Sequence, residues 1–302
     1  MGVKLRWLIA IFFFATGIIW VHDYLGWPQV IADWQSLEPR TLALLLALTF
    51  ASYALRAQRI SRALPAPQPY AFTIYLRISL LHNALNNFLP MRLGEASLPI
   101  MAKRELGLSV VQSTTTLFLV RLMDLHFLLL VLCVSLLPVS LLVGTSGAAA
   151  LLMAALLWRR LMSVVTAIIP QSRQAQLQAV LQHHQKRKLT LELYAYTVLV
   201  WLGKLSALAL IVLSFLDIPF YQGLVAVISA DLSSVLPIHG LAGSGTFESA
   251  ILIALTPFQL EKKEILSAAI NVHLYVLFSS SIGAAMALLI TRHRHRSALS
   301  TP

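Results

Sequence analysis

The sequence predicts an all-α, polytopic integral membrane protein, and three observations support this prediction. Long apolar stretches recur along the whole chain. The mean hydropathy is +0.77, and charged residues make up 12% of the 302 residues, about half the fraction of a soluble domain. Basic residues gather at the ends of the apolar stretches, where lipid headgroups lie. Because no long polar stretch remains, we expect one membrane domain over residues 1–302.

Six apolar segments are candidates for full membrane spans, which need about 20 apolar residues each. We expect them near residues 5–21, 41–55, 109–137, 141–158, 190–215 and 265–290. The first begins like a signal peptide, but no small-residue cleavage site follows it, so we expect it to stay as a helix.

Two further segments, residues 70–104 and 218–255, consist of short apolar pieces on either side of a break that contains proline and glycine. Neither piece is long enough to cross the bilayer. Irregular backbone at that depth requires surrounding protein or a wet cavity. We therefore expect two re-entrant helical hairpins.

The two breaks share a pattern. NFLPMRLGE at residues 87–95 resembles SVLPIHG at 234–240 continued by GTFE at 245–248. Three full spans separate them, an odd number, so the hairpins should enter from opposite faces as an inverted repeat. We expect a first half at about 1–158 and a second at about 190–296. A basic amphipathic cytoplasmic segment, 159–189, would join them.

Orientation follows from the basic residues. With a cytoplasmic N-terminus, most of them fall on the cytoplasmic side, which predicts a bacterial inner (cytoplasmic) membrane protein with both termini inside. The cytoplasmic bases would be Lys4, Arg6, Arg56, Arg59, Arg62, Lys103, Arg104, Arg159, Arg160, Lys186, Arg187, Lys188, Arg292, Arg294 and Arg296. The opposite side keeps Arg40, Lys262 and Lys263 among the loop bases.

Charged side chains inside apolar segments are the candidate site, because each costs at least about 2.5–3.5 kcal/mol to insert. The candidate substrate-binding residues are Arg92, Glu95, Arg121, Asp124, Lys204, Asp231 and Glu248, with Asn87 as a neutral hydrogen-bonding group. Gly94, Gly243 and Gly245 are expected at half-helix ends, whose free N–H groups attract a phosphate.

Each charge also has a structural interpretation. Arg121 and Asp124 share a helix face, so they form either an internal ion pair or a phosphate-binding arginine oriented by its neighbour. Lys204 would partner Asp231, Glu248 or a lipid phosphate. Asp231 is either a coupling proton acceptor or a structural hydrogen-bonding group. Both hairpin glutamates are either helix N-terminal charges or headgroup ligands.

Several function classes find no support. The net charge is +11, but no basic stripe is interleaved with exposed aromatic residues, so we expect no nucleic-acid partner. Cys133 is the one cysteine, and no metal-ligand spacing occurs. No Ser-His-Asp order, HExxH or P-loop appears, so we assign no catalytic residue, metal or cofactor. His183 and His184 lie in a basic stretch and are expected to be solvated.

The ordered motifs resemble the lysylphosphatidylglycerol synthase transmembrane-region family. The resemblance rests on NNFLPMRLGE at 86–95, GLS at 107–109, VRLMD at 120–124, and LP at 236–237 followed by GSGTFE at 243–248. It covers nearly the whole chain. Val120 replaces the family's usual glutamate, and HGLAG at 239–243 replaces its Pro-Gly-Gly turn. These departures bear on the substrate more than on the fold.

The resemblance implies a flippase-like domain that stands alone, without the aminoacyl-transferase domain of the full synthases. We therefore expect a lipid translocase for an anionic phospholipid derivative or a polyprenyl-phosphate-linked lipid. Arg92 and Arg121 would neutralise the phosphate. Two alternatives stay open: an accessory subunit that presents lipid to a separate lipid- or glycan-modifying enzyme, and a membrane-embedded lipid-modifying enzyme.

Overall fold

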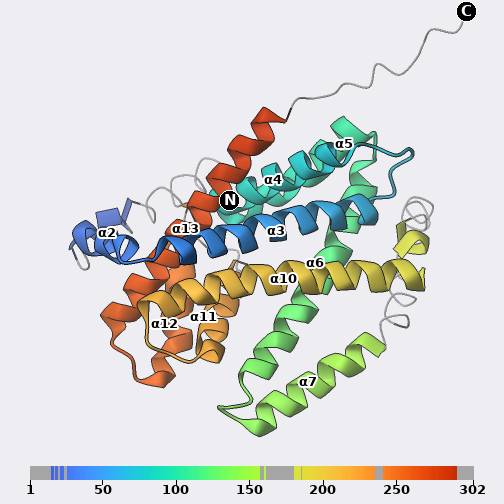
Figure 1. The fold of residues 1–302 in the computed structure, drawn as a ribbon. Coiled ribbons are helices and arrows are strands. Elements are labelled where there is room, and N and C mark those ends of the chain that lie inside the picture. The colour runs from blue at the N-terminus through green and yellow to red at the C-terminus, as the bar shows by residue number, and fades with distance from the viewer. Residues whose placement is uncertain are drawn as a thin grey trace, which may run out of the picture.

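The computed structural model describes residues 15–16, 18–19, 21–23, 26–156, 160, 180–184, 186–234 and 241–290, with backbone alone at 90–92 and 241. All regular elements in these ranges are helices (Figure 1). They are α2 (Trp27–Gln35), α3 (Pro39–Ala63), α4 (Phe72–Phe88), η1 (Pro90–Ala96), α5 (Ser97–Leu106), α6 (Val110–Ser135), α7 (Leu141–Leu156), α10 (Arg187–Phe215), α11 (Phe220–Ser233), η2 (Leu241–Gly243), α12 (Thr246–Leu255), η3 (Thr256–Phe258) and α13 (Lys262–Leu289).

Four described helices, α3, α6, α10 and α13, are long and apolar enough to cross a membrane. The shortest has 25 residues, or about 38 Å of helix against a hydrocarbon core of about 30 Å. Several helices have large apolar side chains on the protein surface. Leu142, Ile253 and Leu289, for example, are each more than 70% exposed. Such surfaces are stable in lipid, so this is a multi-pass helical membrane protein.

These four helices match four of the six expected spans. Of the other two, α7 is described over 16 residues, and most of the first span lies outside the described residues. Most of the joining segment at 159–189 and the C-terminal bases Arg292, Arg294 and Arg296 also lie outside them.

The expected end of the second span is wrong. Helix α3 continues to Ala63, and it buries Arg56 and Arg59 inside the protein with 8% and 2% exposure. These two arginines are therefore not cytoplasmic loop residues. Arg62 is the base that reaches the surface, where it pairs with Glu192 at 3.2 Å.

Two pairs of short helices flank the long ones. Helices α4 and α5 have 17 and 10 residues, and α11 and α12 have 14 and 10. In Figure 1 the α4–α5 pair lies toward the C-terminal end of α3, and the α11–α12 pair lies toward the C-terminal end of α10. Since α3 and α10 run side by side in opposite directions, the two pairs lie at opposite ends of the bundle.

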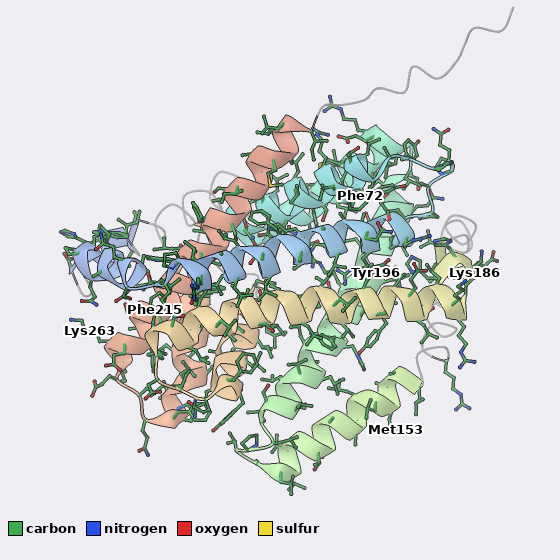
Figure 2. The ribbon with its side chains drawn as sticks, in the orientation of Figure 1. Phe72, Met153, Lys186, Tyr196, Phe215 and Lys263 are labelled. Atoms are coloured by element: carbon green, nitrogen blue, oxygen red, sulfur yellow. The ribbon has the colours of Figure 1, made fainter. Side chains whose placement is uncertain are left out.

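The main core lies where α10 packs between α3, α6, α11 and α13, and it includes Leu205, Ile211, Ile228, Ile265 and Tyr275. Figure 2 shows side chains filling the spaces between these helices, with Lys186 and Lys263 at opposite ends of the bundle. Charged ends and an apolar middle are the distribution expected for a membrane protein.

The two neighbouring histidines before α10 differ from the expectation that both are solvated. His183 is partly exposed, but His184 is 6% exposed. Their Nε2 atoms lie 3.2 Å and 3.1 Å from the carbonyl oxygens of Arg62 and Ala63, at the end of α3. Burial, together with the charge of His183, lowers the pKa of His184 to about 4. A neutral His184 therefore caps the end of α3.

Candidate functional site

A cavity of about 490 Å³ lies between the two halves of the chain. Its walls come from α3, α4, η1 and α6 on one side and from α10, α11, η2, α12 and α13 on the other. The wall on α6 is largely apolar and includes Phe118 and Leu125, which are 57% and 39% exposed. Exposed apolar side chains of α6 therefore form part of the cavity wall.

The first polar group in this cavity surrounds Glu95. The Glu95 carboxylate accepts hydrogen bonds from Arg121 Nη2 at 2.8 Å and from Asn86 Nδ2 at 3.3 Å. His82 Nε2 lies 3.1 Å from Asn86 Nδ2, and His82 Nδ1 lies 3.0 Å from Ser97 Oγ. Residues from α4, η1, α5 and α6 thus hold the glutamate in place.

Close packing of the backbone positions Glu95. A Cβ atom added at Gly94 would lie 2.4 Å from Asn86 N and 2.4 Å from Leu85 C, both backbone atoms of α4. Gly94 therefore lets η1 approach α4. Its neighbour Arg92 lies in η1, but the Arg92 side chain lies outside the part of the chain that the structure describes.

The second group is a buried ion pair. Arg59 Nη1 lies 2.5 Å from Asp124 Oδ1, and Trp201 Nε1 donates to the same oxygen at 2.8 Å. Arg59 also donates to Thr197 at 2.8 Å, and Arg121 Nη1 lies 3.4 Å from Asp124 Oδ2. The predicted contact between Arg121 and Asp124 is thus present, but Arg59 is the nearer partner of the carboxylate.

The third group contains a cation without an acidic partner. Arg56 Nη1 donates to Asn83 Oδ1 at 2.9 Å, and both side chains line the cavity. Asn83 and Asn87 donate to Ser280 of α13 at 3.4 Å and 2.6 Å. This group joins α3, α4 and α13 through neutral amides and a hydroxyl.

The second half of the chain contributes Lys204 and Asp231, whose Nζ and Oδ1 atoms lie 2.6 Å apart. Of the three partners expected for Lys204, the structure has Asp231. The ammonium also lies 4.9 Å from the centroid of the Trp201 ring.

Glu248 does not line the cavity, but it contacts His273, which does. His273 Nδ1 lies 2.5 Å from Glu248 Oε1, and His273 Nε2 lies 2.7 Å from the Ala242 carbonyl oxygen. Both ring nitrogens face oxygen acceptors, so the ring donates from both and carries a positive charge. The other Glu248 oxygen accepts from Gly245 N at 2.8 Å at the start of α12, which is a helix N-terminal role.

The polar pairs have matching positions in the two halves. Arg56 precedes Asn83 by 27 residues, and Lys204 precedes Asp231 by 27. Arg56 and Lys204 each lie 17 residues after the first residue of their helix, Pro39 or Arg187. Glu95 and Glu248 precede the cations Arg121 and His273 by 26 and 25 residues.

Most predicted site residues gather at the cavity. Asn87, Glu95, Arg121, Asp124, Lys204, Asp231 and Gly243 line it. Gly94, Gly245 and Glu248 are not among the residues that line it. Gly243 and Gly245 have φ of +81° and +87°, which glycine adopts without strain, so the turn before α12 requires them.

Sequence reasoning missed Arg56, Trp201 and His273 as cavity residues, whereas Asn83 was among the amides expected either to bind a headgroup or to bond the hairpin backbone. A signal existed for Arg56, since Thr49, Ser52, Arg56 and Arg59 recur every three or four residues and mark one polar face of α3. His273 carried no signal beyond its place inside an apolar span. Leu236, Pro237 and His239 lie outside the described residues.

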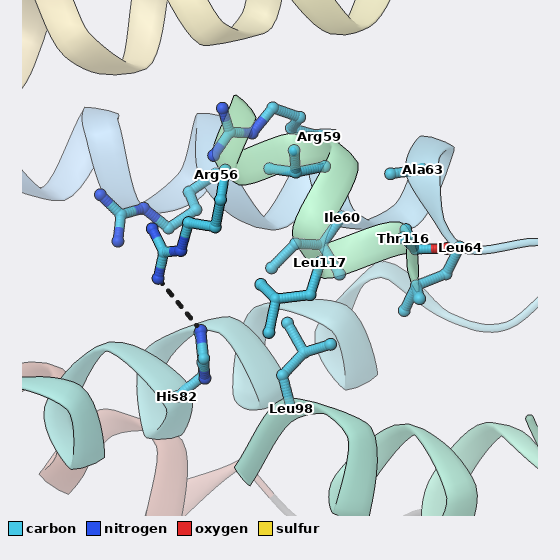
Figure 3. Close-up of a pocket in the computed structure, with 11 residues that line it drawn as sticks. Arg56, Arg59, Ile60, Ala63, Leu64, His82, Leu98, Thr116 and Leu117 are labelled. Carbon is cyan, nitrogen blue, oxygen red and sulfur yellow. Dashed lines mark hydrogen bonds between the residues drawn. The ribbon is translucent and has the colours of Figure 1, made fainter. Parts of the chain in front are cut away.

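A smaller pocket of about 20 Å³ adjoins this site (Figure 3). Figure 3 shows Arg56, Arg59 and His82 lying toward it, and its dashed line marks the 3.5 Å contact between Arg121 and His82. Arg56 and Arg121 line both pockets. Among the described residues, no group of three or more His, Cys, Asp or Glu side chains is arranged for a metal ion.

The fold and the site together define a class: a multi-pass helical membrane protein with a charged cavity between its halves. The chain belongs to the family described as lysylphosphatidylglycerol synthase TM region, whose model matches residues 7–283. This match connects the protein to membrane-lipid metabolism or transport. A comparison with curated proteins finds no match.

Proposed function

We propose that the protein is a lipid translocase for an anionic phospholipid derivative or a polyprenyl-phosphate-linked lipid. One observation carries the proposal: a cavity of about 490 Å³, lined by arginine, lysine, amide and carboxylate side chains, has exposed apolar residues of α6 in its wall. Buried cations in a membrane need an anion or a functional reason. A phosphate headgroup in the cavity would supply that anion while its acyl chains stay in the bilayer beside Phe118.

The second part of the proposal is an inverted repeat with two re-entrant hairpins, α4–α5 and α11–α12. The short helices, their location at opposite ends of the α3–α10 pair and the equal spacing of polar pairs support it. In such repeats the substrate site lies at the interface of the halves, near the bilayer midplane. Alternating opening of the two halves would expose the cavity to one leaflet and then the other.

The residues have separate proposed roles. Arg121 contacts the phosphate while Glu95 and Asp124 hold its guanidinium, and Arg92 of η1 provides a second positive charge. Glu248 and His273 position the turn before α12. Movement would run downhill or be coupled to an ion, because the sequence has no nucleotide-binding motif. We place the protein in the bacterial inner membrane with both termini in the cytoplasm.

Transport by purified protein in liposomes tests this function. The assay follows fluorescent phosphatidylglycerol by its protection from an impermeant quencher. We expect the wild-type protein to move it and Arg121→Ala to move it at least about tenfold more slowly, because a buried charge-assisted contact is lost. Arg62→Ala is the matched control, since it removes an arginine whose side chain is 54% exposed outside the cavity.

Two outcomes would contradict the proposal. One is equal transport by the Arg121→Ala and Arg62→Ala proteins. The other is the absence of lipid movement by wild-type protein, with movement restored by a separate transferase, which would indicate an accessory subunit.

A further inference from the structure

A cation stands at the same position in the two halves, but its partner is a charged carboxylate in one half and a neutral amide in the other. In the second half, Lys204 pairs with a carboxylate, that of Asp231, at 2.6 Å. In the first half, Arg56 pairs with a neutral amide, that of Asn83, at 2.9 Å. The spacing of 27 residues is the same in both pairs. The chain thus has an aspartate in one half at the place where it has an asparagine in the other.

Arg56 therefore forms no direct ion pair among the described residues, although the Asp124 carboxylate lies near enough to act on its charge. Within the described residues, no carboxylate lies within 4.0 Å of its guanidinium, and its Nε has no hydrogen-bond partner. The residue is 8% exposed, so bulk water solvates little of it. A buried cation without an acid is strongly unfavourable unless an anion binds beside it.

The other cations around the cavity differ from Arg56 in this respect. Arg59 has Asp124, and Arg121 has Glu95 and Asp124. Their own Nε atoms are also unpaired, but their guanidinium charges are balanced. An incoming anion would therefore gain most from Arg56.

The surroundings of Arg56 suit a phosphate group. Arg56 and Arg121 line both the large cavity and the small pocket, so they stand where the two join. Asn83, Asn86 and Asn87 add amide donors on the facing side of α4. Guanidinium and amide N–H groups together match the oxygens of a phosphodiester.

We infer that Arg56 binds the lipid phosphate beside Arg121, and that the asparagine at position 83 keeps the charge of Arg56 available for that phosphate. In the second half, the carboxylate of Asp231 pairs with the cation at the corresponding position, Lys204. This inference rests on the proposed function and makes it specific: the substrate's single phosphodiester binds on the α3–α4 side, and the Lys204–Asp231 side stays neutral.

The test introduces a carboxylate beside Arg56. Asn83→Asp places a carboxylate beside Arg56, as Asp231 stands beside Lys204, without changing side-chain size. Gln58→Glu is the matched control, since it also converts an amide to a carboxylate, two residues from Arg56 on α3, at a side chain that lines neither pocket. Native mass spectrometry of the purified proteins measures retention of phosphatidylglycerol, of diacylglycerol with the same acyl chains, and of phosphatidylglycerol in the presence of inorganic phosphate.

We expect Asn83→Asp to lower retention of phosphatidylglycerol at least tenfold and Gln58→Glu to lower it less than threefold. The double variant Asn83→Asp/Asp231→Asn frees Lys204 and should recover at least a third of wild-type retention. Retention of diacylglycerol should be low throughout, and inorganic phosphate should not displace the lipid at equal concentration.

The outcomes separate the inference from the proposed function. Wild-type retention of phosphatidylglycerol with equal losses in the two single variants would overturn the role of Arg56 and leave the translocase proposal standing. No preference of the wild type for phosphatidylglycerol over diacylglycerol would overturn both. Displacement by inorganic phosphate would overturn the assignment of a lipid ligand.

Discussion

At the scale of single residues, the site is a set of buried charges held by specific partners. Arg59 and Asp124 are 2% and 3% exposed, and Trp201 and Thr197 add one hydrogen bond each to the pair. Removing one member of such a pair leaves the other charge buried and unbalanced, which costs far more than losing an exposed pair. The two kinds of pair can be compared in this protein.

We predict that Asp124→Asn lowers the free energy of unfolding by about 3–5 kcal/mol, because Arg59 then keeps its charge without a carboxylate. Glu192→Gln should lower it by less than about 1 kcal/mol, because its partner Arg62 is solvated. Denaturation in mixed detergent micelles measures both. Equal losses in the two variants would mean that the Arg59–Asp124 pair is not the structural link described here.

At the scale of elements, the short helices and the turns between them locate the functional groups. Helices α4 and α5 were largely predictable. Pro90, the Gly94 turn and the apolar pieces on each side mark the break between them. The extent of α3 was not predictable from hydropathy. Arg56 and Arg59 look like loop bases in sequence, and only their partners Asn83, on α4, and Asp124, on α6, explain their burial.

The approach of η1 to α4 gives a prediction for Gly94→Ala. Its Cβ would meet α4 backbone at 2.4 Å, so η1 must shift and the contacts of Glu95 weaken. We expect a loss of about 1–3 kcal/mol in stability, together with reduced lipid transport. Gly203→Ala is the control: its Cβ would lie 3.4 Å from the Leu48 carbonyl oxygen, and alanine favours the helix. The thermal unfolding midpoint of Gly94→Ala should lie clearly below that of Gly203→Ala. Equal midpoints would contradict the close packing of η1 against α4.

At the scale of the whole molecule, helices from both halves of the sequence line the cavity of about 490 Å³. The LP and glycine motifs predict two repeated halves, and most of the predicted charges line the cavity. The pairing of these charges depends on how helices far apart in sequence pack, as in the contact of Asn87 with Ser280 across 193 residues. No local pattern encodes that contact, so neither the free charge of Arg56 nor the role of His273 was predictable.

Photo-crosslinking tests the central claim, that the cavity holds an anionic lipid headgroup, most directly. The probe is phosphatidylglycerol with a photoreactive group beside its phosphate, incorporated with wild-type protein into nanodiscs, and mass spectrometry maps the adducts. The account predicts adducts on the cavity faces of α4 and α6, at residues such as Asn87 and Phe118, and their loss with excess unmodified phosphatidylglycerol. Adducts confined to outward-facing residues, such as Leu142 of α7 and Leu289 of α13, would contradict it.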